Sequence, residues 1–339
     1  MAKVIVAMSG GVDSSVAAFL LKKDGHDVVG ITMRLFTLEE CNNGTVEEAR
    51  KVADQIGVEH HKINLSKEFE EEVIKDFVKE YENGHTPNPC VKCNKTIKFG
   101  YLLQQIDNFE ADYLATGHYA RISGGNLFKG KDERKDQSYF LYGIKKENLS
   151  KIMFPVGNLT KDEVRSIAVK ENLVVAKKPE SQEICFIPDN DYPSFLKKHL
   201  DKVRIMPGLI LDIHGKEIGA HKGLPFYTIG QRRGIDVAGG EPKYVIKIDV
   251  AKNSITVGDE KDLEKGEVEA GNLNWLSETK ESFKAKAKIR YNMAEISGKG
   301  KIDGDKVYFK FDKPVRAVTP GQSIVFYDGD KVLGGGIIA

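Results

Sequence analysis

The sequence predicts an α/β domain built on a parallel sheet, followed by two small β domains of which the last is a β-barrel. At 339 residues the chain exceeds the usual size of one domain. Short apolar runs alternate with longer amphipathic segments through the first half. Beyond about Pro207 the segments become short, with every second residue apolar and with Gly, Asp and Asn turns between them. We therefore expect domains at residues 1–200, 201–262 and 263–339.

The first half alternates expected strands with expected helices, which is typical of a parallel sheet covered by helices on both faces. The apolar runs that we expect to be strands are Lys3–Met8, Val28–Arg34, His61–Leu65 and Tyr113–Gly117. The segments with helical spacing of their apolar residues are Asp13–Lys23, Val46–Ile56, Lys67–Tyr81 and Lys95–Gln105.

The second half contains five segments whose two-residue alternation favours the antiparallel strands of small barrels. They are Tyr244–Asp249, Ser254–Val257, Ala285–Arg290, Lys306–Phe311 and Ser323–Tyr327.

The composition, with 40% hydrophobic and 30% charged residues, is that of a soluble globular protein. The net charge of +1 excludes a polycation, so nucleic-acid binding would need a local basic face. The apolar run near Met1 is too short for a signal peptide or a membrane span. The cysteines, Cys41, Cys90, Cys93 and Cys185, are too few and scattered for a disulfide scaffold. We expect a cytoplasmic protein that does not bind membranes.

The glycine-rich segment Ser9–Ser15 follows a buried strand and opens a helix. Gly10 and Gly11 allow a tight turn and a close approach of the backbone to a ligand, while the first helical N–H groups face an anion. The segment lacks the lysine of a P-loop and the glycine spacing of a Rossmann fingerprint. An ordinary strand-to-helix turn with two glycines is the plain alternative.

Cys93 lies near a predicted helix start beside Lys92 and Lys95, an electropositive setting that favours the thiolate. Cys185 stands between apolar neighbours, so the local sequence favours burial in a strand. For Cys41 we expect a small buried residue.

A basic face is predicted where Lys284, Lys286, Lys288 and Arg290 alternate with small apolar residues. Such a face suits a row of phosphates, whereas a solvated edge strand guarded by lysine is the alternative. With Gln231–Arg233 in the same half and Tyr291 available to stack, RNA contact is favoured.

The segment Ser9–Ser15 resembles the pyrophosphatase loop of the N-type ATP pyrophosphatases. Their fold is of the adenine nucleotide alpha hydrolase type, and they cleave ATP between the α- and β-phosphates to adenylate a carbonyl oxygen. A longer series of segments occurs in the order seen in bacterial tRNA-specific 2-thiouridylases and spans nearly the whole chain. These segments are Ser9–Ser15, Thr86–Pro89 with Cys93–Lys95, Ala115–Tyr119, Lys135–Tyr142, Glu183–Ile187, Gly230–Arg232, Thr319–Gln322 and Gly334–Ile338.

The resemblance implies an enzyme that uses ATP and Mg²⁺ and acts on the anticodon arm of wobble-uridine tRNAs. The implied ATP site consists of Ala7, Met8, Ser9, Gly10, Gly11, Val12, Asp13, Ser14, Ser15, Met33 and Gly117, with Asp13 also holding Mg²⁺. The implied tRNA contacts are Asn88, Pro89, His118, Lys135, Asp136, Gln137, Arg290, Tyr291 and Gln322.

The mechanism that the resemblance implies begins with adenylation of O2 of the uridine, which makes that oxygen a good leaving group. A persulfide donor, such as a cysteine desulfurase or a sulfur relay protein, loads sulfur onto Cys185, and that sulfur attacks C2. Cys93 then frees the sulfur and leaves a Cys93–Cys185 disulfide. The products are 2-thiouridine, AMP and pyrophosphate.

One position departs from the family pattern, because Cys90 stands where an Asp is common. The change creates Cys90-x-x-Cys93, which with Cys185 offers three thiolates for a [4Fe–4S] cluster whose open iron would carry sulfide. A redox pair is the other interpretation of Cys-x-x-Cys, and zinc lacks an obvious fourth ligand. The spacing alone leaves the cluster and the persulfide relay open.

Two other functions remain open on the sequence. A ligase with this loop could adenylate a small molecule, and an RNA-binding module could use the loop only for regulation. Activity that depends on Cys93 and Cys185 would indicate a sulfurtransferase, because a ligase needs neither cysteine. Turnover of ATP to AMP that depends on tRNA would exclude the RNA-binding module.

Overall fold

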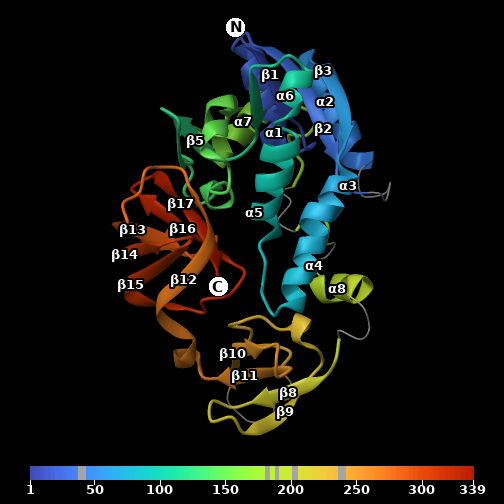
Figure 1. The fold of residues 1–339 in the computed structure, drawn as a ribbon. Helices are drawn as coiled ribbons and strands as arrows, with labels where there is room; N and C mark the ends of the chain where they lie inside the picture. Colours follow the sequence, from blue (N-terminus) through green and yellow to red (C-terminus); the bar gives the residue numbers. More distant parts are fainter. Residues whose placement is uncertain (37–42, 180–183, 188–190, 201–204, 236–241) are drawn as a thin grey trace.

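The computed structural model describes residues 1–36, 43–179, 184–187, 191–200, 205–235 and 242–339. Cys41 lies outside them, so its expected burial stays a prediction. Figure 1 shows the parallel sheet near the N-terminus, the barrel formed by the C-terminal residues, and a small sheet at the opposite end from the N-terminus. The predicted order of an α/β domain followed by β domains is confirmed.

The first sheet has five parallel strands in the order β3-β2-β1-β4-β7. Its strands are β1 (Lys3–Ala7), β2 (Asp27–Arg34), β3 (Glu59–Asn64), β4 (Tyr113–Thr116) and β7 (Ile152–Met153). The central strand β1 is a continuous apolar run because helices cover both of its faces. Val4 and Val6 pack into one hydrophobic cluster, and Ile5 packs into the other.

Two groups of helices cover the two faces. The face of Val4 and Val6 packs against α1 (Val12–Lys23), α2 (Asn43–Ile56) and α7 (Lys161–Lys170). The face of Ile5 packs against a π-helix (Asn94–Tyr101), which continues α5 (Pro89–Cys93) and precedes α6 (Gln105–Asn108). A long helix is formed by α3 (Ser66–Phe69), a π-turn (Glu70–Ile74) and α4 (Lys75–Glu82), and α8 (Tyr192–His199) packs beside it.

The C-terminal barrel consists of six antiparallel strands that close through pairing of the first with the last. They are β12 (Glu264–Trp275), β13 (Ser282–Lys288), β14 (Ile296–Asp303), β15 (Lys306–Arg316), β16 (Ser323–Asp328) and β17 (Lys331–Ile338). The strand with the lysine alternation, β13, is bonded to β14 on one side and to β16 on the other. The interpretation of this segment as a guarded edge strand is therefore wrong, since a closed barrel has no edge.

The middle sheet has four strands in the order β10-β11-β8-β9. They are β8 (Gly208–Leu211), β9 (Glu217–His221), β10 (Tyr244–Asp249) and β11 (Ser254–Gly258). The pair β8–β11 is parallel, so this sheet is mixed rather than purely antiparallel as expected. Short 3₁₀ segments occur at Ser138–Phe140, Lys146–Lys151, Leu224–Phe226 and Glu260–Leu263.

The barrel docks firmly on the first domain. A hairpin of that domain, β5 (Ala120–Ser123) and β6 (Asn126–Lys129), joins the barrel sheet beside β17. The Tyr139 hydroxyl donates to the Ser323 carbonyl at 2.9 Å, and the Asn274 amide donates to the Ile144 carbonyl at 2.8 Å. A single hydrophobic cluster continues from Ile5 to Val325. The barrel is thus held in a fixed position relative to the parallel sheet.

Within the described ranges, no helix combines the length and the apolar character needed to cross a bilayer.

Candidate functional site

The glycine-rich loop lies at the carboxyl end of β1, where the strand order reverses between β1 and β4. Ligands bind in this crevice in open parallel sheets. Gly10 has φ of +65°, and a Cβ there would lie 2.5 Å from the Thr45 carbonyl oxygen. Gly117 directly follows β4 and packs against the loop, since a Cβ there would lie 2.6 Å from the Ser14 nitrogen. Both glycines are therefore required for the loop to fit between its neighbours.

Serine side chains hold the loop in shape from within. The Ser9 backbone N–H donates to the Ser14 hydroxyl oxygen at 3.1 Å, and the Ser15 hydroxyl donates to the Gly11 carbonyl at 2.8 Å. Gly11 is the residue that precedes α1, and no side chain caps this helix. The loop therefore presents an uncapped helix N-terminus, which favours an anion.

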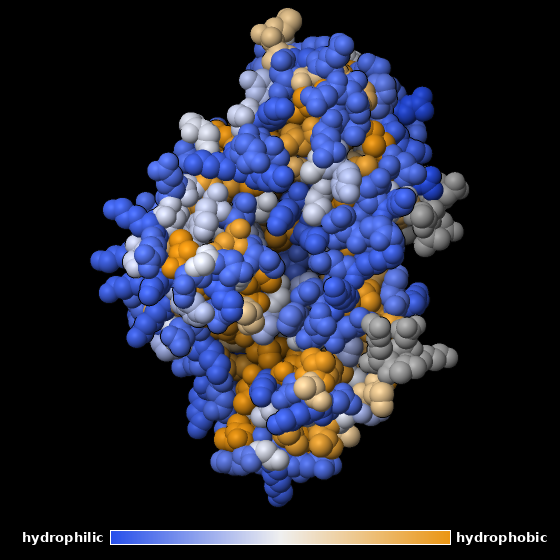
Figure 2. All heavy atoms as spheres, in the orientation of Figure 1, coloured by the Kyte–Doolittle hydropathy of each residue, from blue (hydrophilic) through white to orange (hydrophobic). Residues whose placement is uncertain are grey.

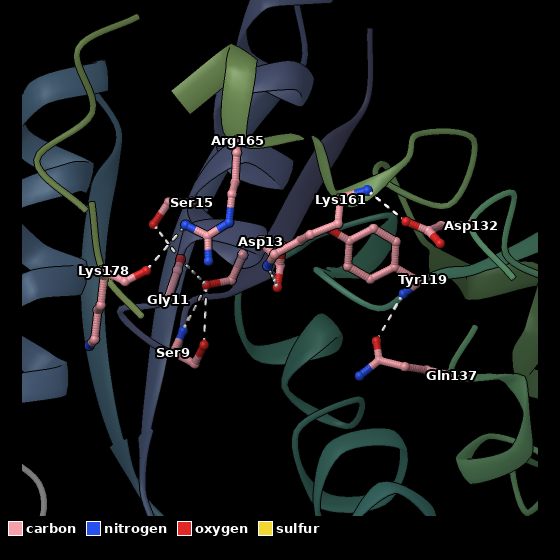
Figure 3. A network of polar contacts seen from close by, with 11 residues as sticks. Ser9, Gly11, Asp13, Ser15, Tyr119, Asp132, Gln137, Lys161, Arg165 and Lys178 are labelled. Carbon is pink, nitrogen blue, oxygen red and sulfur yellow. Dashed lines mark hydrogen bonds and ion pairs between the residues drawn. The ribbon is translucent and has the colours of Figure 1, made fainter. Parts of the chain in front are cut away.

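Asp13, in the first turn of α1, is bonded to a lysine that sequence reasoning missed. The Lys161 ammonium donates to both carboxylate oxygens of Asp13, at 2.6 and 2.8 Å, and the Tyr119 hydroxyl donates to one of them at 2.7 Å (Figure 3). The Lys161 side chain is only 8% exposed, against 32% for Asp13. A nearly buried cation therefore faces the loop.

Two further cations, Arg165 and Lys178, lie near the loop, and Figure 3 shows them on the other side of Asp13 from Lys161. Arg165 lies one helical turn after Lys161 on α7 and donates to the Lys178 carbonyl at 3.4 Å. The Lys178 ammonium donates to the Gly10 carbonyl at 3.0 Å and pairs with Glu48. The only sequence signal for this group is the capping box Thr160-x-x-Glu163, which starts α7 and so places Lys161 at its first position.

The remaining residues of the expected ATP site lie around the same crevice. Ala7 and Met33 are partly buried at the ends of β1 and β2, while Met8 is buried directly after β1. The sheet therefore brings these residues together with the loop, at the edge where its strands end.

Cys93 closes α5, a helix whose start is fixed by Asn88 and Pro89. The Asn88 side chain accepts a hydrogen bond from the Val91 N–H at 3.3 Å, and Pro89 occupies the first helical position. Cys93 itself is buried, and burial raises its pKa to about 11. The expectation of a low-pKa thiolate is wrong, because the side chain faces a hydrophobic cluster. Lys92 points elsewhere and pairs with Asp76 at 3.0 Å.

Cys185 is placed by its neighbour in the sequence. The Phe186 ring contacts Phe69 and Phe77 edge-on, at centroid distances of 5.7 and 5.3 Å, within the cluster that also contains Cys93. Phe186 is buried whereas Cys185 is exposed, so the expected burial of Cys185 is wrong. Phe186 anchors the segment and leaves Cys185 at the surface.

The three cysteines lie close enough to influence one another electrostatically. Although Cys185 is exposed as a residue, the protein around its thiol raises its pKa to about 12, and the Cys93 and Cys90 thiols add to this increase. Cys90 is also exposed as a residue, but the protein around its thiol excludes water and so raises its pKa. Lys98 opposes the increase at all three thiols. The structure therefore brings Cys90, Cys93 and Cys185 together around one lysine.

Lys98 also connects the cysteines with the nucleotide loop. Its ammonium lies 3.4 Å from Nε2 of His118, whose Nδ1 is 2.7 Å from the Thr116 hydroxyl. Burial, with a smaller contribution from Lys98, lowers the pKa of His118 well below its usual value, so this ring is neutral near pH 7. His118 follows Gly117, the residue that contacts the loop. Sequence reasoning missed Lys98, because nothing in its local sequence distinguishes it from other helical lysines.

The structure gives no direct support to the iron–sulfur cluster that the sequence left open. Within the described part of the chain, no three His, Cys, Asp or Glu side chains gather in a way that could hold a metal ion. Mg²⁺ needs fewer protein ligands, since one carboxylate such as Asp13 suffices when phosphates supply the other oxygens.

A pocket of about 600 Å³ opens where the three domains meet, next to the segment that leads to Asn88. The Gln322 amide donates to the Thr86 carbonyl at 2.7 Å, and the Thr86 hydroxyl donates to the Thr228 hydroxyl at 3.1 Å. Arg290 lines the pocket and donates to the Thr319 hydroxyl at 2.9 Å. Two expected tRNA contacts, Arg290 and Gln322, thus meet at one polar pocket.

The other expected tRNA contacts differ in their exposure. Asp136 is buried, and it accepts hydrogen bonds from the Gly130 N–H and from the N–H and hydroxyl of Ser138. Its carboxylate therefore serves the fold of this turn. Lys135 is half-buried. The side-chain amide oxygen of Gln137 accepts a hydrogen bond from the Tyr119 N–H at 2.9 Å, and Tyr291 packs on Phe140 with ring centroids 4.5 Å apart.

The raised pKa of Cys93 predicts slow alkylation at neutral pH. Because only the thiolate reacts, about one molecule in ten thousand is reactive at pH 7, and the rate should rise about tenfold per pH unit up to about pH 10. Iodoacetamide labelling of a variant that keeps only Cys93, followed by mass spectrometry, measures this profile. Lys98→Met should lower the rate at each pH, whereas a plateau below pH 8 would contradict the burial argument.

Comparisons with known proteins agree along the whole chain. Three protein-family models match: the tRNA methyl transferase HUP domain at residues 2–189, the tRNA methyl transferase PRC-barrel domain at 193–259, and the aminomethyltransferase beta-barrel domain at 265–338. The tRNA-specific 2-thiouridylase MnmA of Halothermothrix orenii is 48% identical, and the match covers 100% of this chain and 99% of that protein. The corresponding enzyme of Clostridium acetobutylicum is 45% identical over 99% of each chain.

Proposed function

This chain belongs to the family of tRNA-specific 2-thiouridylases, and we propose on that premise that it is an ATP-using enzyme that thiolates a uridine in tRNA. The observation that carries the proposal is the full-length 48% identity. The arrangement of the site supports it, because Lys98 and His118 lie between the three cysteines and the glycine-rich loop. The wobble uridine, the adenylated intermediate and the persulfide donor are further parts of the same proposal.

In the first step, O2 of the uridine attacks the α-phosphate of ATP and pyrophosphate leaves. The uncapped N-terminus of α1 and the loop N–H groups bind the phosphates. Lys161, Arg165 and Lys178 approach this loop, and a cation there stabilises the negative charge that develops on the leaving pyrophosphate. Mg²⁺, bound at Asp13, would neutralise part of the same charge. The step leaves a uridine whose O2 carries AMP.

In the second step, sulfur replaces AMP. A persulfide donor transfers its terminal sulfur to Cys185, which is exposed and therefore accessible to another protein. The terminal sulfur of the Cys185 persulfide attacks C2, and AMP leaves with its bonding electron pair. The Cys93 thiolate then attacks the inner sulfur of Cys185, which releases the sulfur on C2 and forms a Cys93–Cys185 disulfide. An external thiol reduces this disulfide for the next cycle.

The relay is favoured over a cluster for two reasons. The cysteines do not form a metal-binding group within the described residues, and Cys93 and Cys185 differ in burial as two partners with separate roles would. Cys90 is exposed beside them, and the relay assigns it no covalent step.

The pocket between the three domains is the proposed entry for the anticodon loop. Asn88 and Pro89 immediately precede the cysteines on the helix that starts beside this pocket. The guanidinium of Arg290 and the amide of Gln322 supply hydrogen-bond donors there, and Tyr192 supplies an aromatic ring. Removal of the target uridine from its stack would place the base near Cys90 and Cys93.

The test is a product analysis with unmodified tRNA, ATP and a persulfide donor. We expect 2-thiouridine, AMP and pyrophosphate in equal amounts, with no turnover when tRNA is omitted. AMP formation with a small-molecule acceptor and no thiolation would instead indicate a ligase. Binding of tRNA with no turnover of ATP would indicate an RNA-binding module. Iron-free protein that thiolates fully from the persulfide would exclude the cluster.

A further inference from the structure

Three lysines form a row across the outer surface of the C-terminal barrel. Lys284 on β13 lies directly opposite Lys299 on β14, which lies directly opposite Lys310 on β15. All three side chains are exposed. Neighbouring strands are about 4.8 Å apart, so three positively charged side chains lie side by side on adjacent strands.

A second row runs beside the first. Lys301 on β14 lies opposite Tyr308 on β15, a residue that is 44% exposed and is one of the few large apolar side chains at the surface. Residues of both rows line one hollow of about 550 Å³, so that the lysines and the aromatic ring border the same surface, together with Glu267. Lysines around an exposed aromatic ring are typical of a surface that binds nucleic acid.

The row has no evident structural role. The strands belong to a closed barrel, so the lysines do not protect an edge. Within the part of the chain that the structure describes, no carboxylate forms an ion pair with Lys284, Lys299 or Lys310, although Glu267 lies opposite Lys310 at the end of the row. Like charges directly opposite each other destabilise a sheet. An external anion would remove this repulsion.

We propose that this row binds the phosphate backbone of tRNA outside the reacting nucleotide, an inference that rests on the proposed function. Figure 1 shows β13, β14 and β15 on the side of the barrel away from α5, which carries Cys93. In the same orientation, Figure 2 shows hydrophilic residues projecting along this side. RNA that reaches the row therefore belongs to the body of the tRNA, and the row extends the interface beyond the pocket between the domains.

The experiment compares three triple variants by filter binding of full-length tRNA between 50 and 200 mM salt. The first, Lys284→Gln with Lys299→Gln and Lys310→Gln, removes the row. The second replaces the same residues by Arg and keeps the charge. The third, Lys22→Gln with Lys23→Gln and Lys51→Gln, removes the same net charge from exposed positions on α1 and α2.

We expect the row-removing variant to bind tRNA at least tenfold more weakly at low salt, and its slope of log affinity against log salt to fall by about 2 to 3. The Arg variant and the α1–α2 variant should keep the wild-type slope. An isolated anticodon hairpin should bind wild type and the row-removing variant equally. Thermal unfolding of that variant should be unchanged or shifted upward, because repulsion is removed.

An unchanged salt slope in the row-removing variant overturns the inference, as does an equal loss in the α1–α2 variant, which would reveal an effect of net charge only. Thiolation at saturating tRNA is measured in parallel and should keep its kcat. If wild type does not thiolate tRNA but the row still sets the salt slope, the proposed function fails and the binding surface stands.

Discussion

Cys185→Ser is expected to abolish thiolation, with a loss of at least about a thousandfold, while adenylation continues. Serine cannot carry a persulfide, whereas the loop at Ser9–Ser15 uses no cysteine. Two measurements separate the steps. Pyrophosphate release reports adenylation, and chromatography of the tRNA nucleosides reports 2-thiouridine. Cys93→Ser should also prevent release of the product and leave pyrophosphate formation intact.

The matched control for this experiment is Cys90→Asp, because the family resemblance leads us to expect an Asp at that position. A persulfide relay through Cys185 and Cys93 predicts that this variant keeps most of its thiolation. If Cys90→Asp and Cys90→Ser were both as inactive as Cys185→Ser, the two-cysteine relay would be inadequate and a role shared by all three thiols would replace it.

Lys161→Met is expected to slow adenylation by about a hundred- to a thousandfold, as the loss of one group that stabilises developing charge usually does. The ammonium of Lys161 is nearly buried and faces the loop through Asp13, so bulk solvent cannot replace its charge easily. Tyr119 remains as the other donor to Asp13. The measurement is the rate of tRNA-dependent pyrophosphate release at saturating ATP.

Lys170→Met is the matched control, because Lys170 is exposed on the same helix. It should behave as wild type. Lys161→Met also leaves Asp13 without its ion partner, which lowers stability, and Lys161→Met with Asp13→Asn removes both charges. Recovery of thermal stability without recovery of the rate in the double variant would separate the two effects. A wild-type rate in Lys161→Met would contradict the proposed role.

The fold of the first domain was predictable because its strands are buried on both faces and leave uninterrupted apolar runs. β1 and β2 are of this kind. The hairpin β5–β6 was not predicted, because its short strands Ala120–Ser123 and Asn126–Lys129 are stabilised by the distant strand β17. The alternation of β13 predicted a strand correctly, but only closure of the barrel showed that it is not an edge.

The candidate site likewise has features that the sequence predicts and features that only the folded chain reveals. The sequence by itself determined the nucleotide loop, in which Gly10 adopts a positive φ that favours glycine, and the presence of Cys90, Cys93 and Cys185. The tertiary structure decided which cysteine is buried, since Phe186 and the aromatic cluster that surrounds it place Cys93 inside and Cys185 at the surface. It also decided that Lys98 and Lys161 are the cations near the thiols and the loop. Burial and charge at a site depend on contacts between segments far apart in the sequence, and only the folded chain brings those segments together.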